Sequence, residues 1–503
     1  MSNPLSKNPR QTVNRLLWIA IAAAFAVRFV LLGAFPLMDP TESRYAEIAR
    51  QMFSLGDWVT PWIAPGVPFW GKPPLSFWMT AASFQLFGVG DFAARLPHWV
   101  GGALVAWLTW NWLALRSRRE AALAVAILAG SLLFFVSAGA VMTDMALAIG
   151  LMAVLRGFWL ALHGPPEHRR REQVLMFAGF AVGLLAKGPI ALMAGAAPVI
   201  WAVSAGQFTR SLREIRWLTG GLAVLACVLP WYLLAEARTP GFLEYFIVGE
   251  HWQRYVDAGW TGDLYGHAHE FPRGTIWLFA ILAFLPWSIV LPLVAWKRRR
   301  AGLAVPAEDR ELNRYLWLSA LVPCAVFTLS DNVLWTYVLP GMPALAMLAA
   351  MFLNRTPGGI APERTVAAGV GVTGLVTIGI VAAFNLGGWD DHRSMKTLVA
   401  EFRAVSRGEP LVFFRQVPYS ASFYSAGAAE LALEAADLEA RLAEGLAYVV
   451  LRGRHRARVP ETLLNELRLV RTVDDYSLYT GSAAQAQASR VAAKRASAAS
   501  ASR

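Results

Sequence analysis

The sequence predicts an all-α polytopic membrane protein with a small α/β domain near its C-terminal end. The chain has 503 residues, of which 56% are hydrophobic and only 16% are charged, and its mean hydropathy is +0.43. Long apolar runs recur to about residue 386, each near the ~20 residues that a helix needs to cross a bilayer. After that point short apolar segments flank one helical segment, which is typical of a small α/β domain. This composition excludes an ordinary soluble domain.

About eleven apolar runs are candidate spans, and residues 75–90 are a further candidate, so we expect about 11–13 transmembrane helices. The runs are 15–37, 96–115, 120–138, 145–163, 174–187, 189–205, 217–235, 275–296, 315–330, 333–352 and 366–386. The first run is long and lacks a small-residue cleavage site, so we expect a membrane helix and no cleaved signal peptide.

The distribution of Lys and Arg predicts the orientation. With the N-terminus in the cytoplasm, the loops predicted to lie inside hold every basic cluster, as the positive-inside rule expects. These clusters are RSRR (116–119), HRRRE (168–172), RSLREIR (210–216) and KRRR (297–300). The net charge of +12 therefore indicates topology and contact with anionic lipid, and no nucleic-acid partner.

The same count divides the chain into three predicted regions. A transmembrane domain covers 1–386, with outer-face loops at 38–95 and 236–274. A small extracytoplasmic α/β domain covers 387–482, and an Ala/Ser-rich tail over 483–503 is expected to be disordered. The two cysteines, Cys227 and Cys324, lie within apolar spans, so no disulfide framework and no paired-cysteine metal motif is predicted.

Residues 38–52, MDPTESRYAEIARQM, place a charged helix directly after the first apolar run. Asp39 is predicted as the N-cap, Pro40 as the first helical residue, and Glu42 as the partner that closes a capping box. Capping alone would explain both acids. A role in chemistry requires other polar groups on the same side of the membrane.

Such groups are present in the segments predicted to lie outside. Lys72, Lys187 and Arg254 are unexpected there, because external basic residues near a membrane are disfavoured. Asp144 is a lone acid between two apolar spans. Ionisable groups at such positions are costly and are candidates for function. The alternatives are snorkelling of Lys187 to the interface and an N-cap role for Asp144.

Acids and bases at the outer membrane face suit transfer of a sugar from a lipid-linked donor. As the sugar leaves, negative charge develops on the polyprenyl phosphate, and fixed Lys and Arg side chains or a metal would stabilise that charge. A carboxylate can orient or deprotonate an acceptor hydroxyl. No nucleotide is required, which agrees with the lack of a P-loop motif in the sequence.

Residues 38–88, MDPTESRYAEIARQMFSLGDWVTPWIAPGVPFWGKPPLSFWMTAASFQLFG, resemble the opening of the bacterial aminoarabinose transferase family. These are membrane glycosyltransferases of the GT-C type, related to the dolichyl-phosphate-mannose protein mannosyltransferases. The RYAEIAR, GDWVTP and KPPLSFW segments carry the resemblance, with support from Asp144, AKGPIAL, GEHWQRY and TYVLPGMPALAML (336–348), so that it covers most of 15–350. Family members move a sugar from a polyprenyl phosphate to an extracytoplasmic acceptor, which in the namesake enzymes means 4-amino-4-deoxy-L-arabinose passed from undecaprenyl phosphate to lipid A phosphates.

The resemblance implies a multi-pass protein of the bacterial inner membrane whose active site faces the periplasm. Its implied partners are a polyprenyl-phosphate-linked sugar, a lipid or glycan acceptor and membrane lipid. The predicted site, from the residues and the resemblance together, has catalytic acids Asp39, Glu42 and Asp144, and donor-phosphate ligands Lys72, Lys187, Arg254 and Tyr337, the last carried over from TYVLP. A divalent metal is an open alternative, with His251, His267 and His269 as its candidate ligands against ordinary loop polarity.

The sequence departs from the family pattern at three places. The usual Asp-Glu pair before the first outer helix reads Thr41-Glu42, Gly71 stands where a Glu often precedes Lys-Pro-Pro, and SDNVLW (330–335) lacks the Lys of Ser-x-Lys. These departures leave the sugar and the acceptor open. Two other classes also stay open: a lipid-linked sugar flippase, which should show inverted repeats that the sequence lacks, and an inactive binding relative, against which Lys72 and Asp144 argue.

Overall fold

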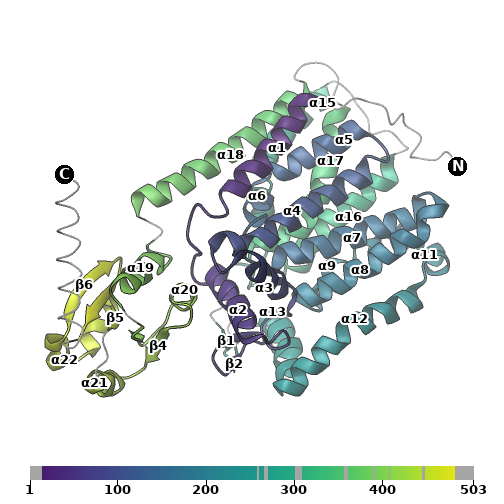
Figure 1. Cartoon of the computed structure of the whole chain (residues 1–503). Helices are drawn as coiled ribbons and strands as arrows, with labels where there is room; N and C mark the ends of the chain where they lie inside the picture. Colours follow the sequence, from purple (N-terminus) through teal and green to yellow (C-terminus); the bar gives the residue numbers. More distant parts are fainter. Residues whose placement is uncertain are drawn as a thin grey trace. The chain divides into compact units, whose positions relative to one another are not determined.

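The chain forms two compact units, which are described separately below. The membrane unit comprises Met1–Leu32 and Gln51–Gly379, and the C-terminal unit comprises Gly33–Arg50 and Ile380–Arg503. The structure is a computed structural model (Figure 1) that describes residues 14–257, 260–265, 270–300, 309–355, 361–388, 391–406, 408–444 and 448–481. The predicted disordered tail, 483–503, lies outside the described residues.

The membrane unit is a bundle of helices (Figure 1) with one small hairpin on its outer loops. Each predicted apolar run coincides with a helix or a pair of helices, and the further candidate at 75–90 is α3. In chain order the elements are α1 (Arg15–Val30), α2 (Thr41–Leu55, shared with the C-terminal unit), β1 (Trp62–Ala64), β2 (Val67–Pro68), α3 (Leu75–Phe87), α4 (Asp91–Leu113), α5 (Arg118–Ala129), α6 (Leu132–Ser137), α7 (Thr143–His163), η1 (Pro166–His168), α8 (Arg169–Lys187), α9 (Ile190–Ala194), α10 (Ala197–Ser204), α11 (Phe208–Glu214), α12 (Trp217–Arg238), the π-helix η2 (Glu244–Gln253), α13 (Arg254–Val256), α14 (Thr275–Ala283), α15 (Trp287–Arg300), α16 (Arg310–Val326), the 3-10 helix η4 (Trp335–Gly341), α17 (Met342–Asn354) and α18 (Pro362–Gly387, whose last residues belong to the C-terminal unit).

Four of the described helical segments are long and apolar enough to cross a membrane alone: α7, α12, the continuous segment Trp335–Asn354, and α18. Two bent pairs raise this to six if each counts as one span: Ile190–Ser204 with Phe208–Glu214, and Thr275–Ala283 with Trp287–Trp296. The other predicted spans are helical but are shorter or more polar. The helical membrane fold is therefore confirmed, and the count of 11–13 spans stays a prediction.

Helix α7 lies at the centre of the membrane unit and packs directly on α8. A Cβ on Gly150 of α7 would lie 2.6 Å from the carbonyl oxygen of Gly179 in α8, so the two backbones touch, as small residues allow in membrane helix pairs. The 21 residues of α7 extend over about 30 Å, which brings its two ends to opposite membrane faces. Because α7 and α8 are antiparallel neighbours, the start of α7 and the end of α8 share a face.

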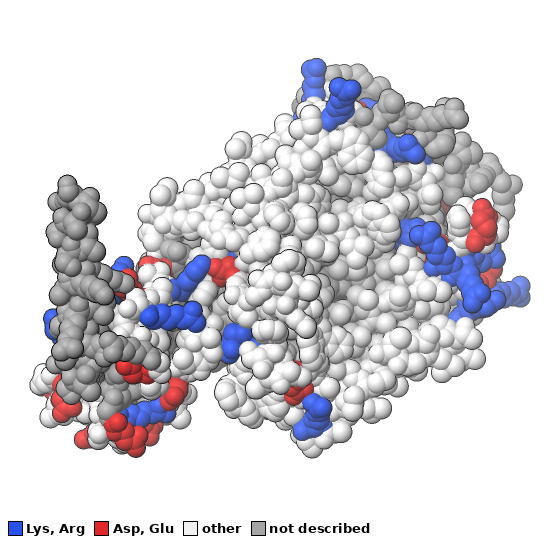
Figure 2. All heavy atoms as spheres, in the orientation of Figure 1, with Lys and Arg blue, Asp and Glu red and all other residues white. Residues whose placement is uncertain are grey.

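The loops that were predicted to be cytoplasmic meet at the other face of the membrane unit. Arg116, which follows α4, pairs with Asp309 before α16, and Arg355 after α17 pairs with the same carboxylate. Arg119 lies 2.6 Å from Glu363 in the first turn of α18. In Figure 2 most Lys and Arg side chains of this bundle lie along its upper and right-hand margins, next to a broad uncharged surface. This agrees with the positive-inside orientation.

The C-terminal unit contains a five-stranded mixed sheet in the order β4-β3-β5-β7-β6, in which β4, β3 and β5 are parallel and β7 is antiparallel to β5 and β6. The small α/β fold predicted for this region is confirmed. Its elements are α19 (Lys396–Val405), β3 (Leu411–Phe414), α20 (Tyr419–Tyr424), β4 (Ala429–Ala432), α21 (Ala435–Ala443), β5 (Tyr448–Arg452), η5 (Gly453–Arg458), α22 (Glu461–Glu466), β6 (Arg468–Val473) and β7 (Tyr476–Thr480).

Helices cover both faces of this sheet. Because successive residues of a strand point to opposite sides, each strand contributes to two separate cores. Leu411 and Phe413 pack in a core with residues of α19 and α20, whereas Val412 and Phe414 pack with residues of α21 and α22. The connection from β3 leads to β4 on one side, and the next connection returns to β5 on the other side of β3. The strand order therefore reverses between β3 and β5.

Candidate active site

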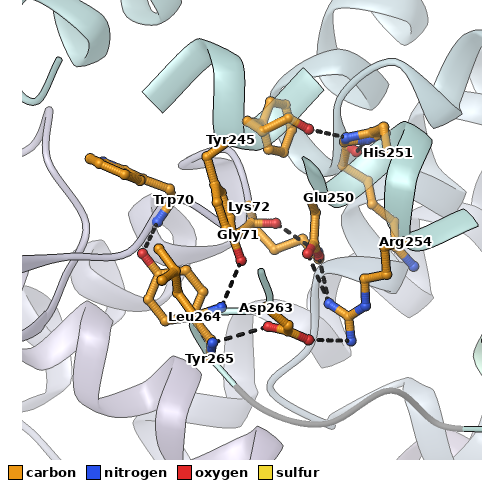
Figure 3. A network of polar contacts seen from close by, with 12 residues as sticks. Trp70, Gly71, Lys72, Tyr245, Glu250, His251, Arg254, Asp263, Leu264 and Tyr265 are labelled. Atoms are coloured by element: carbon orange, nitrogen blue, oxygen red, sulfur yellow. Dashed lines mark hydrogen bonds and ion pairs between the residues drawn. The ribbon is translucent and has the colours of Figure 1, made fainter. Parts of the chain in front are cut away.

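Lys72 is the centre of a buried polar network on the membrane unit (Figure 3). It lies just before α3, and its ammonium pairs with Glu250 of η2 and donates to the carbonyl oxygen of Gly71 at 2.6 Å. The side chains of Lys72 and Glu250 are only 17% and 6% exposed. A buried charge requires such a partner, so the lone basic residue that the sequence indicated is held in a defined position.

The Glu250 carboxylate holds a second cation. Arg254 follows four residues later, and its Nη1 donates to both carboxylate oxygens at 2.8 and 3.0 Å. Its Nη2 lies 3.4 Å from Asp263, whose other oxygen accepts from the backbone N–H of Tyr265 at 3.0 Å. Burial alone would raise the pKa of Glu250, but Lys72 and Arg254 outweigh burial and hold this pKa below its usual range.

A second buried pair joins α8 to α7. The ammonium of Lys187, the last residue of α8, lies 2.6 Å from an Asp144 carboxylate oxygen and 4.3 Å from the centre of the Tyr337 ring. The carbonyl oxygen of Lys187 lies 3.2 Å from Nε2 of His251, the residue next to Glu250, so both pairs belong to one cluster. We call this cluster of Lys72, Glu250, Arg254, Asp263, Lys187, Asp144 and Tyr337 the outer-face cluster.

The structural alternatives for Lys187 and Asp144 were wrong. The Lys187 side chain is 9% exposed and paired, so it does not snorkel to an interface. The N-cap of α7 is Met142, and Asp144 is the second helical residue. The structure thus brings together all four predicted phosphate ligands, Lys72, Lys187, Arg254 and Tyr337, and one predicted acid, Asp144. The roles of these residues in the reaction stay predictions.

His251 ties the two halves of the outer-face cluster together. Its Nδ1 lies 2.7 Å from the carbonyl oxygen of Phe246, and its Nε2 lies 3.2 Å from that of Lys187. Burial lowers the pKa of His251. The neutral ring donates to one carbonyl oxygen through whichever nitrogen carries the proton.

The described residues of the outer-face cluster do not fit a divalent cation. Both ring nitrogens of His251 face carbonyl oxygens, and the Glu250 carboxylate is occupied by two cations. Among the described residues, no three His, Cys, Asp or Glu side chains converge as metal ligands would. His267 and His269 lie outside the described residues, and a metal requirement stays a prediction.

Sequence reasoning gave no role to Glu250, and it did not select Asp263 or the tyrosines that support the loop carrying Lys72. The Tyr265 hydroxyl accepts from the Trp70 N–H at 3.0 Å and donates to the Pro68 carbonyl oxygen at 2.8 Å. The Tyr245 hydroxyl accepts from the Leu264 N–H at 3.2 Å. One available signal was the four-residue spacing of Glu250 and Arg254, which places them on one helix face.

The predicted acids Asp39 and Glu42 belong to the C-terminal unit. Helix α2 begins at Thr41 after a cis Asp39-Pro40 bond, so Pro40 precedes the helix. The Asp39 carboxylate accepts from the hydroxyls of Ser43 and Ser420 and from the Ser420 backbone N–H at 3.0 Å. The predicted N-cap bond is therefore replaced by a link to α20. A Glu42 oxygen accepts from the Met38 N–H at 3.4 Å, and no catalytic role of either acid is tested by these contacts.

A polytopic helical unit with buried cations and carboxylates clustered at one end suits a membrane enzyme that acts on a charged substrate. The family model described as dolichyl-phosphate-mannose-protein mannosyltransferase matches residues 16–246. The crystal structure of ArnT from Cupriavidus metallidurans bound to undecaprenyl phosphate superposes with a TM-score of 0.73 at 21% identity, over 92% of this chain and 97% of that chain. Its apo state gives 0.72 at 22% identity, over 93% and 98%.

Two relatives are named undecaprenyl phosphate-alpha-4-amino-4-deoxy-L-arabinose arabinosyl transferase. That of Aeromonas salmonicida (strain A449) is 31% identical over 402 residues, which cover 76% of this chain and 70% of the relative. That of Edwardsiella ictaluri (strain 93-146) is 28% identical over 68% of this chain and 60% of the relative. The chain therefore belongs to the family of the undecaprenyl phosphate-aminoarabinose arabinosyl transferases. It is a multi-pass glycosyltransferase of the bacterial inner membrane.

Proposed function

We propose that the enzyme transfers 4-amino-4-deoxy-L-arabinose, or a related pentose or hexose, from a polyprenyl phosphate to an acceptor such as lipid A on the periplasmic side. The names of the relatives support this donor and this sugar. The observation that carries the proposal is the outer-face cluster, which holds the buried cations Lys72, Arg254 and Lys187, the last against the Tyr337 ring.

The cations suit the leaving group. The bond between the sugar C1 and a phosphate oxygen breaks, its electron pair stays on that oxygen, and the acceptor oxygen forms the new bond to C1. An ammonium has three N–H donors; the hydrogen bonds of Lys72 among described residues go to Glu250 and Gly71. At least one N–H therefore remains for a phosphate oxygen. Fixed donors of this kind stabilise the developing charge without reorganisation.

The carboxylates match the cations in number. Lys72, Arg254 and Lys187 are balanced by Glu250, Asp263 and Asp144. A phosphate that binds here adds negative charge, so it competes with these carboxylates for the cations. A carboxylate displaced in this way is placed to orient the sugar or its acceptor, and to take the proton from a hydroxyl acceptor. A phosphate acceptor is already anionic and requires no proton removal.

Turnover of labelled polyprenyl-phosphate sugars by the purified chain in lipid nanodiscs tests the proposal. Lys72→Ala should lower kcat by roughly 10²-fold or more, the magnitude typical of losing one charge-stabilising donor, while thermal unfolding shows an intact fold. Arg238→Ala is the matched control, since Arg238 is 52% exposed and pairs with Asp57; its turnover should stay within about twofold of wild type. Full activity of Lys72→Ala, or no turnover with any such donor, would contradict the proposal.

A further inference from the structure

The C-terminal unit has a second polar site, at the carboxyl ends of its parallel strands. The strand order reverses between β3 and β5, and α/β sheets bind ligands outside the carboxyl ends of strands at such a switch point. Here β3 ends at Phe414 and β5 ends at Arg452. Arg454 bridges the two ends, because its Nη2 donates to Oε1 of Gln416 at 3.0 Å.

Three exposed arginines follow β5 on the short helix η5: Arg454, Arg456 and Arg458. Arg415 and Arg452 next to them are paired, with Glu434 at 3.1 Å and with Asp475 at 2.7 Å. Across the described ranges, none of the three on η5 has a carboxylate partner; Arg456 contacts the Tyr479 hydroxyl at 3.4 Å. The switch point therefore carries uncompensated positive charge.

The pKa of His455 responds to the positive charge of these arginines. Arg454 Nε lies 3.1 Å from His455 Nε2, an arrangement in which a guanidinium donates to an unprotonated ring nitrogen. Burial lowers the pKa of His455, and the charges of Arg454, Arg458 and Arg452 lower it further. The site thus disfavours another cation and favours an anion.

We propose that Arg454, Arg456 and Arg458, with Gln416, bind a phosphate monoester at the switch point between β3 and β5. Guanidinium groups bind phosphate oxygens in bidentate fashion. In the context of the proposed function, on which this assignment of the ligand rests, the phosphate is that of the phosphorylated lipid acceptor. The site would hold the acceptor by its anionic group independently of the reacting atoms.

The full chain in neutral detergent micelles allows a direct test. The probes are dioctanoyl phosphatidic acid, which carries a lipid phosphate monoester, inorganic phosphate, and uncharged dioctanoylglycerol, with binding measured by calorimetry. The site variant is Arg454→Gln/Arg456→Gln. The control variant Arg403→Gln/Arg468→Gln removes the same total charge from α19 and β6, and binding at the membrane unit is common to both.

The site variant should bind phosphatidic acid about tenfold more weakly than the control variant, a difference of about 1.4 kcal/mol. The two variants should have the same affinity for dioctanoylglycerol. Weakening for phosphatidic acid alone assigns the site to a lipid phosphate; equal weakening for inorganic phosphate supports a phosphate site but rejects the lipid source. Equal affinities of the two variants, whether reduced or unchanged, would overturn the proposal. This test needs no turnover, so it stands apart from the test of the transferase reaction.

Discussion

Lys187 and Asp144 form a buried ion pair, with 2.6 Å between the ammonium and a carboxylate oxygen, across 43 residues of sequence. The pair depends on the close backbone contact of α7 and α8 at Gly150 and Gly179, which brings the end of one helix beside the start of the other. Neither side chain is more than a tenth exposed. Each charge is therefore tolerated only in the presence of the other.

Lys187→Met should destabilise the protein by about 3–5 kcal/mol, because it leaves the Asp144 carboxylate buried without its cation. The double variant Asp144→Asn/Lys187→Met should lose much less than the sum of the two single variants, since no charge is stranded. Denaturant unfolding in one fixed lipid composition measures all three. Arg238→Met, which breaks an exposed pair, should cost about 0–1 kcal/mol. A Lys187→Met protein as stable as this control would show that the pair is dispensable.

Glu250→Gln should lower kcat at least about tenfold, because one carboxylate positions both Lys72 and Arg254. The control is Glu244→Gln, on the same π-helix but exposed, which should leave turnover unchanged. The lowered pKa of Glu250 means that its contribution to stability is complete above the usual value of 4.5 and is lost as the pH falls through the lowered pKa. Acid unfolding of Glu250→Gln should therefore lack this component. Equal kinetics of the two variants would remove Glu250 from the site.

Asp39→Asn separates a structural role from a catalytic one. Asparagine keeps an acceptor for the Ser420 N–H, so we expect the fold to persist at neutral pH, whereas Asp39→Ala leaves that N–H unpaired and should cost about 1–3 kcal/mol. Burial raises the pKa of Asp39 above 3.8 despite the bonds from Ser420 and Ser43. Wild type should thus lose stability as the pH rises through this raised pKa, and Asp39→Asn should not. The predicted catalytic role requires lost turnover in the Asn variant; retained turnover would reject it.

The sequence predicted the helical membrane fold, the sites of its helices and the three cations of the outer-face cluster. Lys72, Lys187 and Arg254 were identifiable because unpaired external charge is costly near a membrane. Asp144, the partner of Lys187, was predicted as well. Glu250, the partner of Lys72, was not, since it lies 178 residues from Lys72 and only tertiary packing joins them. The start of α2 was misjudged for a similar reason, because a local capping pattern at Asp39 was overridden by Ser420, 381 residues away.

Helices α7, α12 and α18 have nearly the same apolar composition, yet α7 is almost wholly enclosed by protein, whereas α12 and α18 are buried over only about a quarter of their central residues. Lipid tails accept any apolar side chain of suitable length, but a close-packed protein neighbour does not. The outer helices are therefore free to exchange Leu, Ile, Val and Phe as lineages diverge. The rate of amino-acid substitution should be slow around the whole circumference of α7 and fast on the lipid-facing sides of α12 and α18. Substitution rates therefore distinguish two environments that have nearly the same mean hydropathy.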